Sequence, residues 1–262
     1  MQMLAMGAVD DRLRACVSQA GSRLDLWVEF KKSMNIERMA EIGVYRGDFA
    51  QGILTACETM KAYYMIDPWR HLDNWNKPSN HEHAVLEQCF HETMRKTDFA
   101  ATKRIVLRGK TTEVAEKLAD GELDFVYIDG DHTLRGIAID LIRLYAKVRT
   151  GGFVGGDDFN NSIWEHKTEF EPTLVFPFAV YFAEAVGARI YALPYSQFCL
   201  QKASESRFEF IDLTAHYGDL SLRDQVTLPK LLKIRMWERF PGVMSVVRKT
   251  RNVFLRKNPS NR

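Results

Sequence analysis

Residues 123–132 read LDFVYIDGDH and change from apolar to acidic within a few positions. The apolar part predicts a strand buried on both faces, which is typical of a parallel sheet covered by helices. In open sheets of this kind, ligands bind outside the carboxyl ends of the strands. Asp129, Asp131 and His132 follow the strand directly, so we expect chemistry at this end of the sheet.

Strand-like and helix-like segments alternate along the chain on both sides of this stretch. Strands are predicted at 38–45, 62–69, 104–109, 125–130 and 151–158, and helices at 49–57, 81–97, 111–119, 136–148 and 178–187. This alternation indicates a doubly wound parallel α/β sheet. Two short strands at 188–193 and 198–203, joined by a tight turn, are expected to pair antiparallel at the edge of the sheet.

The chain divides by composition into three parts. We predict an N-terminal helical segment over residues 1–37, one domain over 38–225, and a basic amphipathic extension over 226–262. Residues 229–262 hold ten Lys and Arg against one acidic residue, whereas the whole chain carries a net charge of only +2. The extension also holds apolar residues beside its charges: Leu231, Leu232, Ile234, Met236, Trp237 and Phe240. Such a segment suits an anionic membrane surface, and packing on the domain or a dimer contact stay open.

Composition and cysteine usage are those of an ordinary soluble protein. The chain is 46% hydrophobic and 27% charged, as globular domains usually are. Its four cysteines are scattered singly without a CxxC pair, which argues against a disulfide framework or a zinc ribbon. Neither a signal peptide nor a run of roughly 20 apolar residues is found. We therefore expect a cytoplasmic location, with membrane contact only peripheral and through the extension.

The loop EIGVYRG, residues 41–47, follows the first predicted strand. Gly43 allows a tight turn there, and Gly47 allows a ligand or a helix to approach closely. Asp67 ends the next strand, where a carboxylate often holds ribose hydroxyls, although Asp before Pro can also simply begin a turn. The fingerprint GxGxxG is absent, and Glu41 would repel a pyrophosphate. A nucleoside with a positive end, such as S-adenosylmethionine, fits this set better.

Three carboxylates are expected to meet at the ends of neighbouring strands. Asp129 ends the fourth predicted strand, and Asp157 and Asp158 end the fifth. Carboxylates this close repel one another unless protons or a cation compensate them, and Mg²⁺ prefers such oxygen ligands. The alternative is that Asp157 or Asp158 merely caps the segment that follows.

Taken in order, EIGVYRG, the strand end at Asp67, RGKTTE, YIDGDH and GGFVGGDDF resemble the motifs of seven-stranded S-adenosylmethionine-dependent O-methyltransferases. Over residues 38–202 the chain resembles in particular the metal-dependent group, which includes catechol-type enzymes and the sugar methyltransferases of macrolide and aminocoumarin biosynthesis. The resemblance implies a Rossmann-like, doubly wound seven-stranded sheet in the order 3-2-1-4-5-7-6, with the last-numbered strand antiparallel.

The resemblance also implies roles for individual residues. It assigns cofactor binding to Glu41, Gly43, Tyr45, Gly47, Asp67, Gly109, Lys110, Thr111 and Asp129, and metal binding to Asp129, Asp157 and Asp158. His132 stands where the catechol group has a lysine base and where some sugar methyltransferases have a histidine. His132 and Asp129 are therefore the expected catalytic residues.

The expected activity is Mg²⁺-dependent O-methylation of a hydroxyl on a saccharide or a glycosylated small molecule. The metal would lower the pKa of the acceptor hydroxyl, and His132 would take the proton. Segments 71–80 and 159–172 combine Trp, Asn and charged residues, so we expect them to form the acceptor pocket, with His166 lining it. A catechol or phenol methyltransferase and a non-catalytic binding module remain alternatives. We expect a small-molecule or glycan acceptor as partner, no nucleic acid, and leave a homo-oligomer open.

Overall fold

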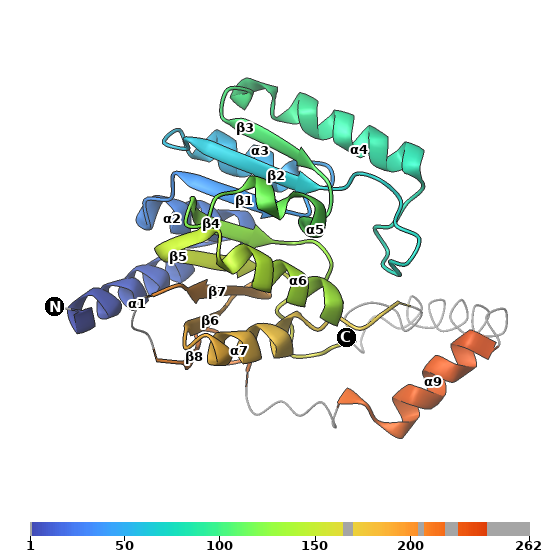
Figure 1. Ribbon diagram of the computed structural model, residues 1–262. Helices are drawn as coiled ribbons and strands as arrows, with labels where there is room; N and C mark the ends of the chain where they lie inside the picture. The colour runs from blue at the N-terminus through green and yellow to red at the C-terminus, as the bar shows by residue number, and fades with distance from the viewer. Residues whose placement is uncertain (1, 165–169, 204–206, 218–224, 240–262) are drawn as a thin grey trace, which may run out of the picture.

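A computed structural model describes residues 2–164, 170–203, 207–217 and 225–239. Within these residues, eight strands form one sheet in the order β3-β2-β1-β4-β5-β7-β6-β8 (Figure 1). The strands are β1 (Arg38–Ile42), β2 (Ala62–Asp67), β3 (Arg104–Arg108), β4 (Leu123–Ile128), β5 (Val148–Gly156), β6 (Arg189–Leu193), β7 (Gln197–Gln201) and β8 (Glu209–Asp212). The predicted order of the first seven strands is confirmed.

The direction of the strands also follows the prediction. The five strands from β3 to β5 are parallel, and β7 runs antiparallel to both β5 and β6. The eighth strand, β8, corrects the expected count of seven and pairs parallel with β6. It has only four residues and no buried one, so it shows neither an apolar run nor a clear alternation in the sequence.

Helices cover both faces of the sheet, as a doubly wound fold requires (Figure 1). The covering helices are α1 (Gln2–Gln19), α2 (Arg23–Ser33), α3 (Asp48–Ala56), α4 (His83–Lys96), α5 (Thr111–Val114), α6 (Leu134–Tyr145) and α7 (Val175–Ala185). A further helix, α9 (Leu228–Arg239), lies away from the sheet. Successive side chains of β4 belong to different cores. Phe125 and Tyr127 face the core under α1 to α4, whereas Val126 and Ile128 face the core under α5 to α7.

The two N-terminal helices form part of the first core. Trp27 on α2 stacks on Phe125 of β4 with ring centroids 5.1 Å apart, and it contacts Phe30 and Tyr127 edge-on. Leu13 of α1 is fully buried in the same cluster. Because aromatic side chains bury large apolar areas, α2 is held firmly on the sheet, and its first residue lies beside the strand ends.

All four cysteines are free and buried, as expected for a chain without a disulfide framework. Among the described residues, no helix has the length and apolarity needed to cross a membrane. In α9, Leu228, Leu231, Leu232 and Met236 are exposed. The rest of the predicted extension from residue 240 onward, and His166 in the acceptor loop, lie outside the described residues.

Candidate active site

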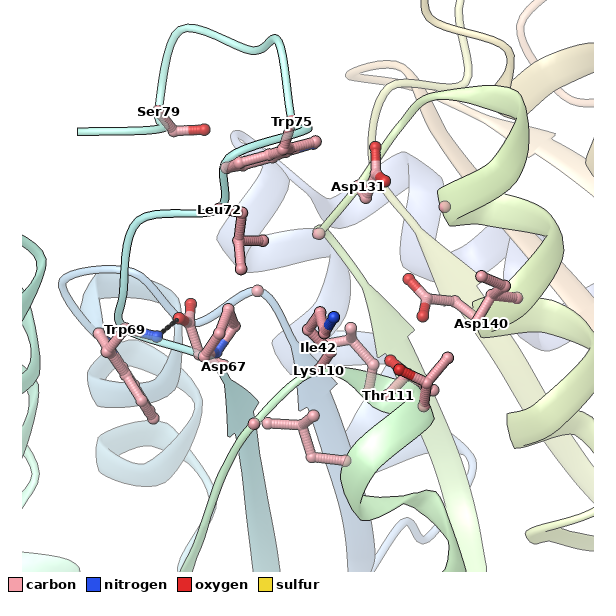
Figure 2. A pocket seen from close by; sticks show the side chains of 18 of the residues that line it. Ile42, Asp67, Trp69, Leu72, Trp75, Ser79, Lys110, Thr111, Asp131 and Asp140 are labelled. Carbon is pink, nitrogen blue, oxygen red and sulfur yellow. Dashed lines mark hydrogen bonds between the residues drawn. The ribbon is translucent and has the colours of Figure 1, made fainter. Parts of the chain in front are cut away.

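A cavity opens at the carboxyl ends of β1, β2 and β4, where the sequence predicts ligand binding (Figure 2). We call it the strand-end cavity. Seven residues predicted to bind the cofactor line it: Gly43, Tyr45, Asp67, Gly109, Lys110, Thr111 and Asp129. Two others, Glu41 and Gly47, are not among its lining residues.

Gly43 is required by the close crossing of two loops. Its φ is +87°, and a Cβ atom there would lie 2.0 Å from the carbonyl oxygen of Asp129. A side chain at this position would therefore push the β1 and β4 strand ends apart. Gly47 is also needed, with φ +74°, but a Cβ there would meet the side chain of Thr93 on α4 at 2.7 Å. Gly47 thus serves the packing of helices, not the cavity.

Asp67 is held by the backbone at the end of β2. Its Oδ2 accepts a hydrogen bond from the Tyr45 amide at 2.9 Å, and its Oδ1 accepts one from the Trp69 amide at 2.7 Å, the latter drawn in Figure 2. Burial raises the pKa of Asp67, and these amides act in the opposite direction. A carboxylate has about four acceptor positions. The side chain both fixes the turn and can accept further bonds from a ligand.

Glu41 is buried on β1 and does not line the cavity. Its Oε2 accepts a hydrogen bond from the Tyr63 hydroxyl at 2.7 Å, and the side chain is buried. Burial raises the pKa of Glu41 to about 8, although the hydrogen bond from Tyr63 lowers it. The carboxyl group is therefore mostly neutral at pH 7 and is poorly suited to hold a positive ligand group.

The opposite wall of the cavity holds two acidic residues, Asp131 and Asp140, to which no catalytic or binding role was assigned from the sequence. Asp140 on α6 is buried beside Thr111 (Figure 2). Burial raises its pKa to about 7, while a hydrogen bond with Thr111 lowers it. Asp131 accepts a hydrogen bond from the Thr133 amide at 3.0 Å. Asp140 could have been suspected, because it falls on the buried stripe of α6 with Ile137 and Leu144.

A positive charge lies between two of the predicted metal ligands. Nη1 of Arg23, the first residue of α2, is 3.2 Å from Oδ2 of Asp129 and also bonds Oδ2 of Asp157. Burial disfavours its charge, but the charges of Tyr127, Asp157 and Asp129 raise the pKa of Arg23 above its usual value. Arg23 was not predicted from the sequence, since nothing near it in the chain resembles a site motif.

Gln197 on β7 fixes Asp157 from the other side. Its Nε2 donates to Oδ1 of Asp157 at 2.5 Å, and its Oε1 accepts from the Trp27 indole at 2.8 Å and the Tyr127 hydroxyl at 2.9 Å. Gln197 is fully buried. The same amide therefore positions both Asp157 and the helix that carries Arg23.

His132 lies between the remaining carboxylates. Its Nδ1 contacts Oδ2 of Asp158, and its Nε2 is 3.6 Å from Oδ1 of Asp129. Nε2 is buried and has no hydrogen-bond partner within the described part of the chain. Burial lowers the pKa of His132, but the bond to Asp158 and the nearby charges raise it to about 9. Burial and the charge of Asp157 raise the pKa of Asp129 to about 7.

The three predicted metal ligands do not face one ion in this arrangement. Asp129 and Asp157 share the guanidinium of Arg23, and Asp158 is turned toward His132. Among the described residues, no group of three or more His, Cys, Asp and Glu side chains is arranged to hold a metal. The assignment of Asp129, Asp157 and Asp158 as Mg²⁺ ligands stays a prediction. In this structure the cation that contacts Asp129 and Asp157 is the side chain of Arg23.

The two predicted acceptor loops differ in their exposure to the cavity. In segment 71–80, Trp75 lines the cavity, and its indole N–H is buried without a partner in the described part of the chain. In segment 159–172, the indole N–H of Trp164 donates to the Gln225 carbonyl at 2.6 Å. Lys77 ties the loops together through the carbonyl oxygen of Glu171 at 3.0 Å.

Residues 40–159 match the sequence model of a family described as "Methyltransferase domain". The matched stretch runs from β1 to just beyond β5. The enzyme class predicted from the sequence is thereby confirmed. No protein of curated function matches the chain.

Solved structures agree with the methyltransferase fold. The O-methyltransferase NovP is 18% identical to this chain, with a TM-score of 0.52 over 75% of this chain and 80% of NovP. The O-methyltransferase TomG from Streptomyces achromogenes is 13% identical, with a TM-score of 0.49 over 74% of this chain and 87% of TomG. At these identities the likeness concerns the fold alone. Arg23 and Gln197 lie outside the matched methyltransferase domain, so they are features of the surrounding chain.

Proposed function

We propose that this chain is an S-adenosylmethionine-dependent O-methyltransferase acting on a hydroxyl of a saccharide or a glycosylated small molecule. The observation that carries the proposal is the strand-end cavity. A glycine turn and the half-buried carboxylate of Asp67 lie at its β1–β2 side, and Asp129 lies at its β4 side. His132 does not line the cavity but lies next to Asp129. The methyltransferase domain match supports the same activity.

The lining of the cavity suits the nucleoside part of the cofactor. Asp67 would hold the ribose hydroxyls, because its oxygens keep acceptor capacity beyond the two amide bonds. Lys110 and Thr111 would flank the adenine, with the apolar side chains of Ile42 and Leu72 nearby. S-adenosylmethionine supplies the methyl group and leaves as neutral S-adenosylhomocysteine, so catalysis depends mainly on positioning and on activating the acceptor.

In this proposal His132 acts as the base. Asp158 holds Nδ1, which leaves the unpaired Nε2 as the atom that can take a proton. A histidine oriented by a carboxylate in this way is a common arrangement for general bases. Because neighbouring charges raise the pKa of His132 to about 9, the neutral base becomes more abundant as the pH rises above neutrality.

The acceptor class is inferred from Trp75. An aromatic face at the cavity with an unpaired buried N–H suits a sugar, whose ring has apolar faces and whose hydroxyls accept hydrogen bonds. A phenolic acceptor could stack on the same ring, and it is the second outcome that an acceptor screen can give. Mg²⁺ dependence would require Arg23 to leave the two carboxylates, so no step of this proposal involves a metal.

A methyl-transfer screen tests the proposal. The full chain is incubated with methyl-labelled S-adenosylmethionine and a panel of glycans, glycosides and phenols. We expect label in a saccharide hydroxyl. His132→Ala should bind the cofactor normally and lose about 10²–10⁴-fold in turnover, as expected for a lost general base. Transfer to phenols alone would reject the saccharide acceptor, and a wild-type rate in His132→Ala would reject the assigned base.

A further inference from the structure

We propose that Arg23 is the built-in cation of the acceptor site, and that this chain transfers methyl groups without a bound metal ion. The proposal rests on the proposed function and extends it to residues outside the methyltransferase domain match. It concerns the Arg23 cluster, defined as Arg23, Asp129 and Asp157.

The geometry of the Arg23 cluster resembles that of a cation site. One nitrogen, Nη1, contacts a carboxylate oxygen of both Asp129 and Asp157, which come from the ends of two adjacent strands. A divalent ion bound between these two residues would compete with the guanidinium for their Oδ2 atoms. Placed beside the guanidinium, the ion would also be repelled by it. Arg23 and a metal ion therefore exclude each other at this position.

Arg23 is held at this position by more than its ion pairs. It is the first residue of α2, whose N-cap Ser22 accepts a hydrogen bond from the Asp25 amide at 3.1 Å. The guanidinium carbon lies 5.9 Å from the centre of the Phe49 ring. The next turn of α2 is anchored by Trp27, which bonds the same Gln197 that bonds Asp157. The helix and the carboxylate thus share one buried support.

A cation at this position would favour the reaction. The acceptor O–H bond breaks and its proton goes to Nε2 of His132, the oxygen forms a bond to the methyl carbon, and the sulfur keeps the electron pair of the broken S–C bond. Negative charge builds on the acceptor oxygen in this step, next to Asp129. The side chain of Arg23 is 40% exposed, so part of it can reach an acceptor. Donors aimed at such a developing charge are an efficient means of catalysis.

The first test measures metal binding and needs no acceptor. Mn²⁺ is titrated into the full chain, and binding is followed by electron paramagnetic resonance. We expect no Mn²⁺ site that depends on Asp157 in the wild type. Arg23→Gln should gain one, about tenfold or more tighter than any wild-type binding, because two carboxylates lose their compensating charge. Adding Asp157→Asn to Arg23→Gln should remove the site again.

Matched variants keep this test specific. Arg14→Gln removes the same charge from an exposed position on α1 and should gain no site. Arg23→Lys keeps the charge and should gain none either. A wild-type Mn²⁺ site that disappears in Asp157→Asn would overturn the proposal. An Arg23→Gln variant that is folded and gains no Mn²⁺ site would also overturn it. Thermal unfolding verifies that the variant is folded.

Activity gives a second and independent readout. With any acceptor that the chain methylates, we expect the wild-type rate to be unchanged by a chelator, and loss of activity that Mg²⁺ restores would overturn the proposal. Titration of S-adenosylmethionine into the chain tests the proposed function separately from the proposal on Arg23. A chain that does not bind it would reject the proposed function, while the Mn²⁺ titration would still decide what Arg23 does.

Discussion

The position of the Glu41 side chain in the structure differs from the one that its sequence motif implies. The motif places a carboxylate near the positive end of the cofactor, whereas the structure buries Glu41 against Tyr63. Burial raises its pKa to about 8. The folded protein therefore keeps a proton on Glu41 at pH values where the unfolded chain has lost it.

This predicts a pH-dependent cost of Glu41 to stability. Between the ordinary pKa of 4.5 and the folded value of about 8, the unfolded state binds fewer protons, so stability falls as the pH rises, by up to about 1.4 kcal/mol per pH unit. Glu41→Gln removes this dependence. In urea unfolding, the free energy of unfolding of Glu41→Gln should increase relative to that of the wild type from pH 5 to pH 8. An equal difference at both pH values would mean that Glu41 is ionised in the fold.

His132 gives a second prediction at this scale, in the pH dependence of turnover. The rate should rise with pH through about 9, because only neutral His132 can accept a proton. Asp158→Asn removes a charge and a hydrogen bond that raise this pKa, so the rising limb should move down by about one to three units. Rates measured from pH 6 to pH 10 check this. If the rising limb of the pH–rate profile stays in place in Asp158→Asn, it reports the titration of a group other than His132.

The sequence predicted residues of the strand-end cavity where the backbone alone positions them. Gly43, Asp67 and Asp129 follow strand ends, and the direction of a parallel sheet brings such ends together. Arg23 and Gln197 could not be predicted in this way. Their contacts with Asp157 cross 134 and 40 positions of the chain, and they depend on how α2 and β7 pack against the sheet.

At the scale of elements, some strands are evident from the local sequence, whereas others depend on tertiary packing. Buried parallel strands such as β4 are continuous apolar runs, so their places and order were predictable. The edge strand β8 is short and half-buried, and its pairing with β6 comes from tertiary packing, which local sequence does not encode. The sequence also predicts that the three carboxylates at the strand ends attract a cation. It does not predict that the side chain of Arg23 contacts two of them.

The helix α9 gives a prediction for the C-terminal extension. Leu231, Leu232 and Met236 are exposed beside Lys233 and Arg235, and α9 lies away from the sheet in Figure 1. A basic helix with exposed apolar residues should sediment with anionic liposomes at low salt and less so at high salt. Leu231→Glu with Leu232→Glu should weaken this binding. A wild-type chain that ignores anionic liposomes at low salt would end the membrane interpretation and leave intramolecular or dimer packing.

At the scale of the whole molecule, the site is assembled from more than the matched domain. Residues 40–159 supply the cavity and the acidic strand ends. The N-terminal helix α2 adds Arg23, and β7 adds Gln197. The division into segments 1–37, 38–225 and 226–262 stays a prediction, and a chain that lacks residues 1–37 would lose both the cation and the Trp27 core.

Binding of S-adenosylmethionine to Asp67 is the most direct test of the central claim, that the strand-end cavity is the cofactor site. Isothermal titration compares the wild type with Asp67→Ala, and thermal unfolding verifies that both are folded. We predict one site per chain in the wild type. We predict affinity at least about tenfold weaker in Asp67→Ala, since one or more hydrogen bonds to a charged group are lost. Equal affinity in the two proteins, or no binding by the wild type, would contradict the claim.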